Sequence, residues 1–254
     1  MQIAATAFLV KLSASDLRYT LHAELNYYIG VLMEQTPVHE QHNPDLLALI
    51  PKDAKVIVEV GCSSGALARE YKKINSNCRY IGVECVPAYA RLAERHCDSV
   101  IVNDIEIVDE DYLRNILVGD CWIFGDALEH LRDPWALLSR IRKVIPDNGS
   151  IVACIPNAQH WSFQVRLNCG EFRYEDSGLL DRTHIRWFTR LTINEMFRDA
   201  GFKIVDGFSR IFDEPNRERV LPAIKAMAAC IGADPEIAAK DALPLQYVLR
   251  AVPV

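Results

Sequence analysis

The sequence predicts an α/β fold, a Rossmann-like and mostly parallel sheet of seven strands with helices on both faces. Short apolar runs rich in β-branched residues recur from residue 56 onward, and helical patterns separate them. Strands that alternate with helices are typical of a parallel sheet covered on both sides. Directly after the first run, Gly61 and Gly65 allow a sharp turn into a helix. Together these features indicate one large α/β domain.

The expected strands and helices alternate over most of the chain. The apolar runs predict strands at 56–60, 80–83, 99–102, 121–124, 150–155, 202–208 and 246–252. The helical patterns lie at 66–74, 87–96, 111–117, 134–144, 192–200 and about 218–231. Because the last strand follows a long excursion, we expect it to pair antiparallel at the edge of the sheet.

Two helix starts carry a clear sequence signal. Asp133 precedes Pro134, and an aspartate N-cap followed by proline at the first helical position is typical of a helix start. Thr192 and Glu195 have the spacing of a capping box, and Gly201 has the position that ends the same helix. The face of the first helix that should pack on the sheet carries Trp135, Leu138, Ile141 and Ile145.

Three segments do not fit the alternation. Residues 1–45 form an expected helical N-terminal segment, either a lid over the cofactor or a contact in a homodimer. Residues 46–254 form the main domain, with interruptions at about 156–190 and, as a helical excursion, at about 212–244. Connections longer than about 12–15 residues are uncommon unless they carry function. We therefore interpret residues 156–190 as an insertion that covers the active site.

Composition and charge exclude several classes of protein. With 254 residues, 24% of them charged, and a net charge of −6, the chain has no general nucleic-acid footprint. No apolar run approaches the roughly 18 residues that a membrane span needs, and the apolar stretch 3–10 lacks the basic start of a signal peptide. None of the eight cysteines forms a C-x-x-C pair, so we expect free thiols in a reducing cytoplasm and no metal site.

Acidic residues stand at the ends of four expected strands. Glu59 ends the first strand, Glu84 follows the second, Asp104 the third and Asp126 the fourth. The carboxyl ends of parallel strands meet at one edge of the sheet, where ligands bind. Glu84 lies 19 residues after Gly65, and an acid at that spacing can accept hydrogen bonds from both ribose hydroxyls. The pattern predicts a ligand that contains a nucleoside.

These segments resemble the class I S-adenosylmethionine-dependent methyltransferases. The matching motifs are Glu59-Val-Gly-Cys-Ser-Ser-Gly65, Glu84, Asn103-Asp104, Asp126-Ala-Leu-Glu-His-Leu-Arg-Asp-Pro134 and Pro146-Asp-Asn-Gly149. A narrower group, often associated with polysaccharide and sugar modification, is similar in two further segments. They are Pro156-Asn-Ala-Gln-His-Trp161 and Gly178-Leu-Leu-Asp-Arg-Thr-His-Ile-Arg-Trp-Phe188. The resemblance covers about residues 45–210.

The resemblance implies S-adenosylmethionine as the cofactor and a role for each matched residue. Glu59 and Gly61 would shape the loop under the methionine part, Glu84 would hold the ribose, and Asp104 would read the adenine amine. The full set of implied cofactor-binding residues is Glu59, Gly61, Cys62, Ser63, Gly65, Glu84, Cys85, Asn103, Asp104 and Asp126. Ser63 stands where the family usually has a glycine. A serine would fit there if its φ were negative, or its hydroxyl would bond the carboxylate of the cofactor.

The catalytic candidates are His184, His130 and Asp181. A hydroxyl that accepts a methyl group must lose its proton, and a histidine suits that task near neutral pH. Aromatic side chains that would stack on a sugar ring are Trp161, Tyr174 and Trp187, with core packing as the equal alternative for Trp187. The implied function is O-methylation of a sugar hydroxyl in a glycan or a glycosylated small molecule, with a histidine as general base.

Other functions stay open at this point. The acceptor could be another small-molecule metabolite that is methylated on nitrogen or carbon. A nicotinamide-dependent or nucleotide-sugar oxidoreductase would also fit the spacing between Gly65 and Glu84, but the first loop is not G-x-G-x-x-G and no Tyr-x-x-x-Lys pair is present. A third alternative is a non-catalytic module that binds a partner in a biosynthetic complex.

Overall fold

The computed structural model of the chain describes residues 37, 38 and 40–254. The predictions for the N-terminal segment of residues 1–45, a helical lid or a dimer contact, therefore lie almost entirely outside the described residues. The last part of this segment contains the start of α2 (Pro44–Leu49), where the side chain of Asn43 caps the helix by accepting from the backbone N–H groups of Asp45 and Leu46.

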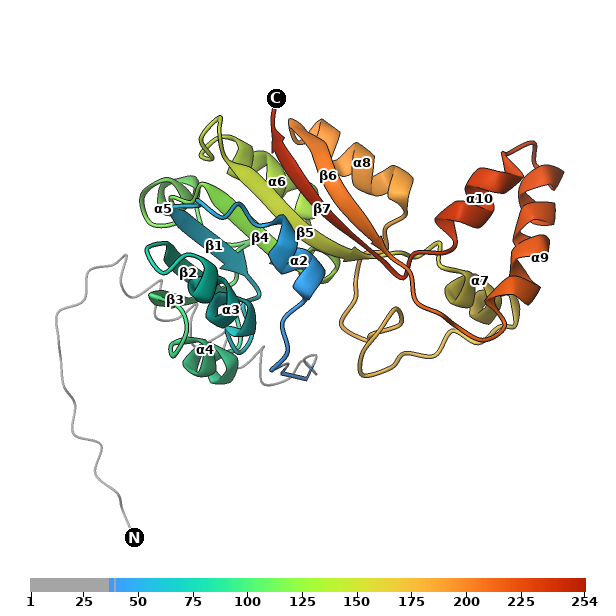
Figure 1. The fold of residues 1–254 in the computed structure, drawn as a ribbon, viewed down its shortest axis with the longest axis horizontal. Coiled ribbons are helices and arrows are strands. Elements are labelled where there is room, and N and C mark those ends of the chain that lie inside the picture. Colours follow the sequence, from blue (N-terminus) through green and yellow to red (C-terminus); the bar gives the residue numbers. More distant parts are fainter. Residues whose placement is uncertain (1–36, 39) are drawn as a thin grey trace, which may run out of the picture. The chain divides into compact units, whose positions relative to one another are not determined.

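A seven-stranded sheet forms the centre of the fold (Figure 1). The strands are β1 (Val56–Val60), β2 (Arg79–Glu84), β3 (Ser99–Val102), β4 (Cys121–Gly125), β5 (Ser150–Pro156), β6 (Phe202–Arg210) and β7 (Gln246–Pro253). Their order is β3-β2-β1-β4-β5-β7-β6, with β1 to β5 parallel to one another and β7 antiparallel to both of its neighbours. All seven predicted strands and the fold class are confirmed.

The last strand differs from the prediction in its position. β7 is antiparallel as expected, but it lies between β5 and β6, and β6 occupies the edge. The two strands differ in burial, because Val248, Leu249 and Ala251 of β7 are buried while most residues of β6 are exposed. A strand that is apolar on both faces is stable inside a sheet, whereas a polar strand tolerates the edge.

Helices cover both faces of the sheet. In the described part of the chain, the helices after α2 are α3 (Ala66–Ile74), α4 (Pro87–Ala93), α5 (Glu110–Asn115), α6 (Pro134–Arg142), α7 (Trp161–Asn168), α8 (Arg190–Asp199), α9 (Arg217–Cys230) and α10 (Pro235–Asp241), with a 3-10 turn η1 (Leu128–His130). Of these, α7 belongs to the insertion and α9 and α10 to the later excursion. Since successive strand residues point to opposite faces, Val58 and Trp122 pack with apolar residues of α5, α6 and α8. Ile57 and Ile123 pack on the other face with residues of α2, α3 and α4.

The helix starts confirm one prediction and correct another. The Asp133 side chain accepts from the N–H of Ala136, and Pro134 is the first residue of α6, as expected. However, α8 begins at Arg190, because Thr189 is the N-cap and shares a capping box with Thr192. Thr192 is thus the third helical residue instead of the cap. On α6, Trp135 is 41% exposed, so the predicted buried face holds for Leu138, Ile141 and Ile145 but not for this residue.

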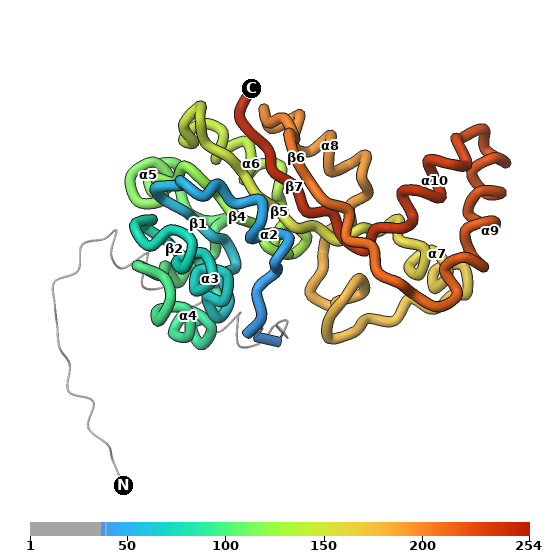
Figure 2. Tube along the Cα trace, viewed as in Figure 1, coloured from blue at the N-terminus to red at the C-terminus, as the bar shows by residue number. Residues whose placement is uncertain are grey.

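The two interruptions of the alternation pack on each other. The two ends of the insertion lie side by side, because Asn157 near its start and Phe188 near its end form a parallel bridge. Inside the insertion, α7 packs against α9, and α9 packs against α10, both from the later excursion (Figure 2). The buried side chain of Asn157 donates to the carbonyls of Asp241 and Pro244, which joins the two segments.

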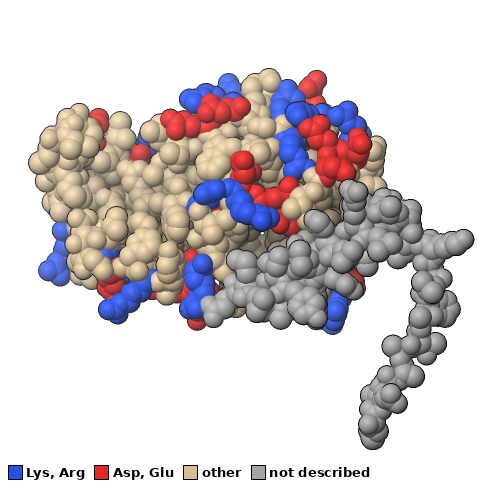
Figure 3. Space-filling view, turned by 180° about the vertical axis from the view of Figure 1, so that it is seen from behind, with Lys and Arg blue, Asp and Glu red and all other residues tan. Residues whose placement is uncertain are grey.

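Charged side chains of both signs are interspersed on the face shown in Figure 3. Several form ion pairs across elements, such as Arg132 with Asp104 at 2.7 Å and Arg190 with Asp241 at 2.7 Å. Among the residues that the structure describes, no helix is both long and apolar enough to cross a membrane.

Candidate active site

The candidate site lies where the order of the strands reverses, at the carboxyl ends of β1 and β4. β1 pairs with β2 on one side and with β4 on the other, so the loops that follow these strands are neighbours. In open α/β sheets a ligand binds at this kind of reversal. The structure therefore brings together the loop after β1, the end of β2 and the residues after β4, as the sequence predicted.

The loop after β1 takes a left-handed backbone conformation at three positions. The φ angles are +74° at Gly61, +48° at Ser63 and +76° at Gly65. The condition set for Ser63, a negative φ, is therefore wrong, and serine occupies a conformation that favours glycine. The N–H of Ser63 donates to Oε2 of Glu84 at 2.9 Å, and this hydrogen bond ties the loop to β2.

Gly65 precedes α3 and leaves its first N–H groups without a side-chain cap. Free N–H groups and the helix dipole make such an end favourable for negatively charged groups. The side chain of Cys62 points elsewhere, since it is 3% exposed and packs in the core against Cys97. A Cβ atom on Gly82 would lie 2.6 Å from the Cys62 sulfur, so this thiol fills space under β2. We conclude that Cys62 contributes packing and backbone to the site.

Glu84 is 6% exposed and is fixed by backbone donors. Its two carboxylate oxygens accept from the N–H groups of Ser63 and Val86, each at 2.9 Å. Burial raises the pKa of Glu84, while these hydrogen bonds act to lower it. Cys85 follows with an exposed side chain, 3.7 Å from the Glu84 carboxylate.

Glu59 is also 6% exposed, and it has a partner that the sequence did not indicate. The hydroxyl of Tyr80 donates to Oε2 of Glu59 at 2.9 Å. Burial, aided by the charge of Glu84 and opposed by the Tyr80 hydrogen bond, raises the pKa of Glu59 to about 8. The parallel register of β1 and β2 places Ile57 opposite Tyr80, and Glu59 shares the face of Ile57, which accounts for the contact.

The residues after β3 and β4 are held by side chains that come from later in the chain. Asp104 pairs with Arg132 at 2.7 Å and accepts from the N–H of Glu106, while Asn103 accepts from the N–H of Asp104. Asp126 has a φ of +54°, and its carboxylate accepts from the side chain of Gln246 at the start of β7. Arg132 lies within the Asp126–Pro134 motif, but its partner could not be predicted, and nothing in the sequence pointed to Gln246, because both contacts depend on tertiary packing.

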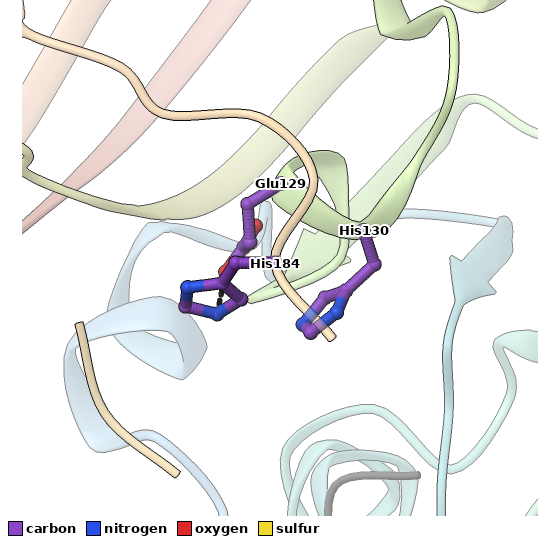
Figure 4. Close-up of side chains that lie close together, drawn as sticks. All are labelled: Glu129, His130 and His184. Carbon is purple, nitrogen blue, oxygen red and sulfur yellow. Dashed lines mark ion pairs between the residues drawn. The ribbon is translucent and has the colours of Figure 1, made fainter. Parts of the chain in front are cut away.

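Two histidines and a glutamate form a cluster of Glu129, His130 and His184 (Figure 4). Glu129 and His130 belong to η1, whereas His184 comes from the insertion. The rings of the two histidines meet edge to face with centroids 4.8 Å apart, and Nε2 of His184 lies 3.8 Å from a carboxylate oxygen of Glu129. The backbone carbonyl of Glu129 accepts from the N–H groups of Ile185 and Arg186, so the insertion is fastened to η1.

The predicted catalytic residues thus come together, with Glu129 as a member that the prediction missed. Its position directly before His130 in the Asp126–Pro134 motif was the available signal. Burial lowers the pKa of His184 to about 4, and the neighbouring His130 lowers it further. Burial also lowers the pKa of His130. The pKa of Glu129 is raised far above its usual value by burial and by the charge of Asp126.

Asp181 is linked to His130 through Thr183. Its carboxylate accepts from the N–H of Thr183 at 2.8 Å and from the Thr183 hydroxyl at 2.6 Å. That hydroxyl lies 3.0 Å from Nδ1 of His130. Arg182, the next residue, forms an ion pair with Asp176 at 2.5 Å. Asp181 is therefore placed to position Thr183 and His130.

The comparisons with known proteins agree with this geometry. The family described as a methyltransferase domain matches residues 35–206, more than half of the chain. The chain belongs to this family. It is a class I methyltransferase that uses S-adenosylmethionine.

One curated relative is the ubiquinone biosynthesis O-methyltransferase of Cereibacter sphaeroides, 23% identical over 176 residues that cover 66% of this chain and 68% of the relative. A solved S-adenosylmethionine-dependent methyltransferase of Thermotoga maritima superposes with a TM-score of 0.54 at 16% identity, covering 93% of this chain and 95% of its own. The magnesium protoporphyrin IX methyltransferase of Synechocystis PCC 6803 with bound S-adenosylhomocysteine has a TM-score of 0.53 at 10% identity, with 96% and 90% covered. These structures share the fold with this methyltransferase.

The described residues fit S-adenosylmethionine. The uncapped start of α3 at Gly65 offers N–H groups to a carboxylate, and Glu84 offers a fixed carboxylate to ribose hydroxyls. Gly61 is required by its left-handed φ of +74°, since an added Cβ would make only an ordinary contact with Ala127 at 3.5 Å. The roles of Glu59, Asn103, Asp104 and Asp126 toward the cofactor stay predictions.

Proposed function

We propose that this methyltransferase methylates a hydroxyl oxygen of a sugar, in a glycan or a glycosylated small molecule. The observation that carries the proposal is the histidine cluster after β4 with a row of aromatic rings on the insertion beside it. Phe172, Tyr174 and Trp187 are 39%, 54% and 39% exposed, and the ring of Phe172 contacts the other two at centroid distances of 5.6 and 6.3 Å. Exposed rings with an apolar face suit the faces of a pyranose.

The aromatic row is tied to the histidine cluster through the backbone. Trp187 follows His184 by three residues, and the N–H groups of Ile185 and Arg186 between them donate to the carbonyl of Glu129. A sugar held on the row would therefore be held next to the cluster. Trp161, the third predicted stacking residue, donates its indole N–H to Glu214 at 2.8 Å, and its stacking on a sugar stays a prediction.

The cluster can take up the proton that a hydroxyl must lose. When bound, S-adenosylmethionine supplies a methyl group on a positively charged sulfur. Each histidine has its Nδ1 beside a backbone carbonyl, at 3.1 Å from Thr183 for His130 and at 3.4 Å from Leu179 for His184. Nε2 of either ring is then the atom that can accept the hydroxyl proton. The Cereibacter relative, an O-methyltransferase by name, supports oxygen as the acceptor atom.

N-methylation or C-methylation of another small molecule is the alternative that the same fold would serve. The non-catalytic reading and the oxidoreductase reading lose their support, since the family is a methyltransferase family. All eight cysteines carry free thiols, which supports the reducing cytoplasm as the proposed location. A homodimer formed through residues 1–45, and the roles proposed for the insertion and the excursion, stay predictions.

The test is a screen with S-adenosylmethionine labelled in its methyl group, over sugar nucleotides, glycans and glycosylated metabolites. We expect label transfer to a sugar oxygen, identified by mass spectrometry of the product. Trp187→Ala should raise KM for that acceptor about tenfold, because loss of one stacking ring costs about 1–1.5 kcal/mol. Trp135→Ala is the matched control, a tryptophan of similar exposure (41%) outside the row. Turnover only with amine or carbon acceptors would overturn the sugar proposal.

A further inference from the structure

The carboxylate of Glu129 is buried without a hydrogen-bond partner. The residue is 1% exposed, and neither of its side-chain oxygens has a partner among the described residues. The charges of Asp126 and Asp181 also act on this carboxylate, so its surroundings are acidic. A buried carboxylate is expensive unless a cation or hydrogen-bond donors compensate it. This arrangement points to a positively charged partner other than a protein side chain.

The two histidines lie where they would complete a metal site with Glu129. One ligand atom from each of Glu129, His130 and His184 lies within 4.8 Å of the others, and Nε2 of His184 is 3.8 Å from Oε1 of Glu129. A transition metal with bonds of about 2.0–2.2 Å holds its ligand atoms about 3–4 Å apart. Small rotations of the side chains therefore suffice to bring all three atoms onto one ion (Figure 4).

The surroundings of the histidines fix the rings in the orientation that metal binding needs. Nδ1 of His130 lies at the backbone carbonyl of Thr183, and Nδ1 of His184 lies at that of Leu179. A ring that donates through Nδ1 presents the lone pair of Nε2, and backbone carbonyls commonly orient metal-binding histidines in this way. His184 is buried, with 7% of the residue exposed, whereas His130 is half-buried.

We propose that Glu129, His130 and His184 bind one divalent transition-metal ion such as Zn²⁺. Two imidazoles and one carboxylate form a donor set that suits metal ions between hard and soft, such as Zn²⁺. Three protein ligands leave one coordination position open. The sequence analysis predicted no metal site. Thr183 lies 53 residues after His130 and His184 follows it directly, so the two histidines are too far apart along the chain to match a metal-binding motif. Only the packing of the insertion on η1 brings the third ligand to the other two.

The role of the ion, though not its binding, rests on the proposed function. An acceptor hydroxyl on the open coordination position would have its pKa lowered, as water has on zinc. Histidines that ligate through Nε2 cannot also accept the hydroxyl proton. The metal site therefore replaces the direct histidine base, and the proton leaves to solvent.

The test uses the full chain without an affinity tag, stripped with a chelator and titrated with Zn²⁺ and with Co²⁺ by calorimetry and visible absorption. We expect one ion per chain, visible d–d bands for Co²⁺, and a higher thermal midpoint with the ion bound. Glu129→Gln, His130→Gln and His184→Gln should each weaken binding at least tenfold. His160→Gln is the matched control, since His160 is another fully buried histidine beside a carboxylate, 3.1 Å from Glu214.

Circular dichroism of each variant separates loss of the site from loss of the fold. Glu129→Gln is nearly isosteric and replaces a buried carboxyl group that has no hydrogen-bond partner, so it should fold and still bind weakly. Sub-stoichiometric binding by the wild-type chain, or equal binding by a folded Glu129→Gln variant, would refute the metal site. Binding without methyl transfer to any acceptor would leave the site intact and remove the proposed function. Turnover that a chelator does not reduce would support the histidine base and overturn the catalytic role of the ion.

Discussion

Replacing Gly65 by alanine should cost far more stability than the same change at Gly232. Both glycines have left-handed backbones, with φ of +76° and +75°. An alanine pays about 1–2 kcal/mol for that conformation, offset by about 0.4–1 kcal/mol from the reduced entropy of the unfolded chain. At Gly232 nothing lies within 4 Å of an added Cβ, so we expect a net loss of about 0.5–1 kcal/mol.

At Gly65 the new Cβ would also meet the backbone of α4. It would lie 3.0 Å from Cα of Ala93 and 3.3 Å from the Ala93 carbonyl oxygen, which cannot rotate away. Overpacking of this kind adds about 1–3 kcal/mol, which brings the expected loss to roughly 2–4 kcal/mol. Urea denaturation should give a lower midpoint at unchanged slope, and affinity for S-adenosylmethionine should fall as α3 shifts. Equal losses at the two glycines would refute the steric argument.

Three further predictions concern the loop after β1 and its partners. Ser63→Gly should stabilise the chain by about 0.5–1 kcal/mol in urea denaturation, since it relieves a left-handed serine at a smaller entropic cost; a loss of stability would contradict the φ of +48°. Glu59 has its pKa raised from 4.5 to about 8, so its contribution to stability is complete below about pH 4.5 and is lost as the pH rises to about 8. At about 1.4 kcal/mol per pKa unit this amounts to roughly 3–5 kcal/mol, and Glu59→Gln should flatten the fall in urea midpoint between about pH 5 and 8; an unchanged slope would disprove the shift. Glu84→Gln should weaken S-adenosylmethionine binding ten- to a hundredfold in calorimetry, because one charged hydrogen-bonding oxygen is worth about 1.5–3 kcal/mol; an unchanged affinity would contradict the role of Glu84 at the ribose.

The sequence alone predicted the fold class, all seven strands and most helices. Those features depend on local periodicity and on capping residues such as Asp133, which act over a few neighbours. Family motifs led to S-adenosylmethionine, and the strand ends led to the edge of the sheet where Glu59 and Glu84 lie. The place of β7 inside the sheet could not be predicted, because it depends on which of two antiparallel strands buries both of its faces.

Only the tertiary structure determined which side chains contact the predicted acidic residues and which conformation the loop after β1 takes. Three of the predicted acids have partners from other strands or loops: Glu59 contacts Tyr80, Asp104 contacts Arg132 and Asp126 contacts Gln246. The spacing of residues along the chain does not predict these contacts. The sequence left the conformation of Ser63 open, since φ is set by the hydrogen bond that closes the loop on Glu84. The insertion carries His184 back to η1 and next to the unpaired carboxylate of Glu129, a meeting that depends on packing between segments far apart in the sequence.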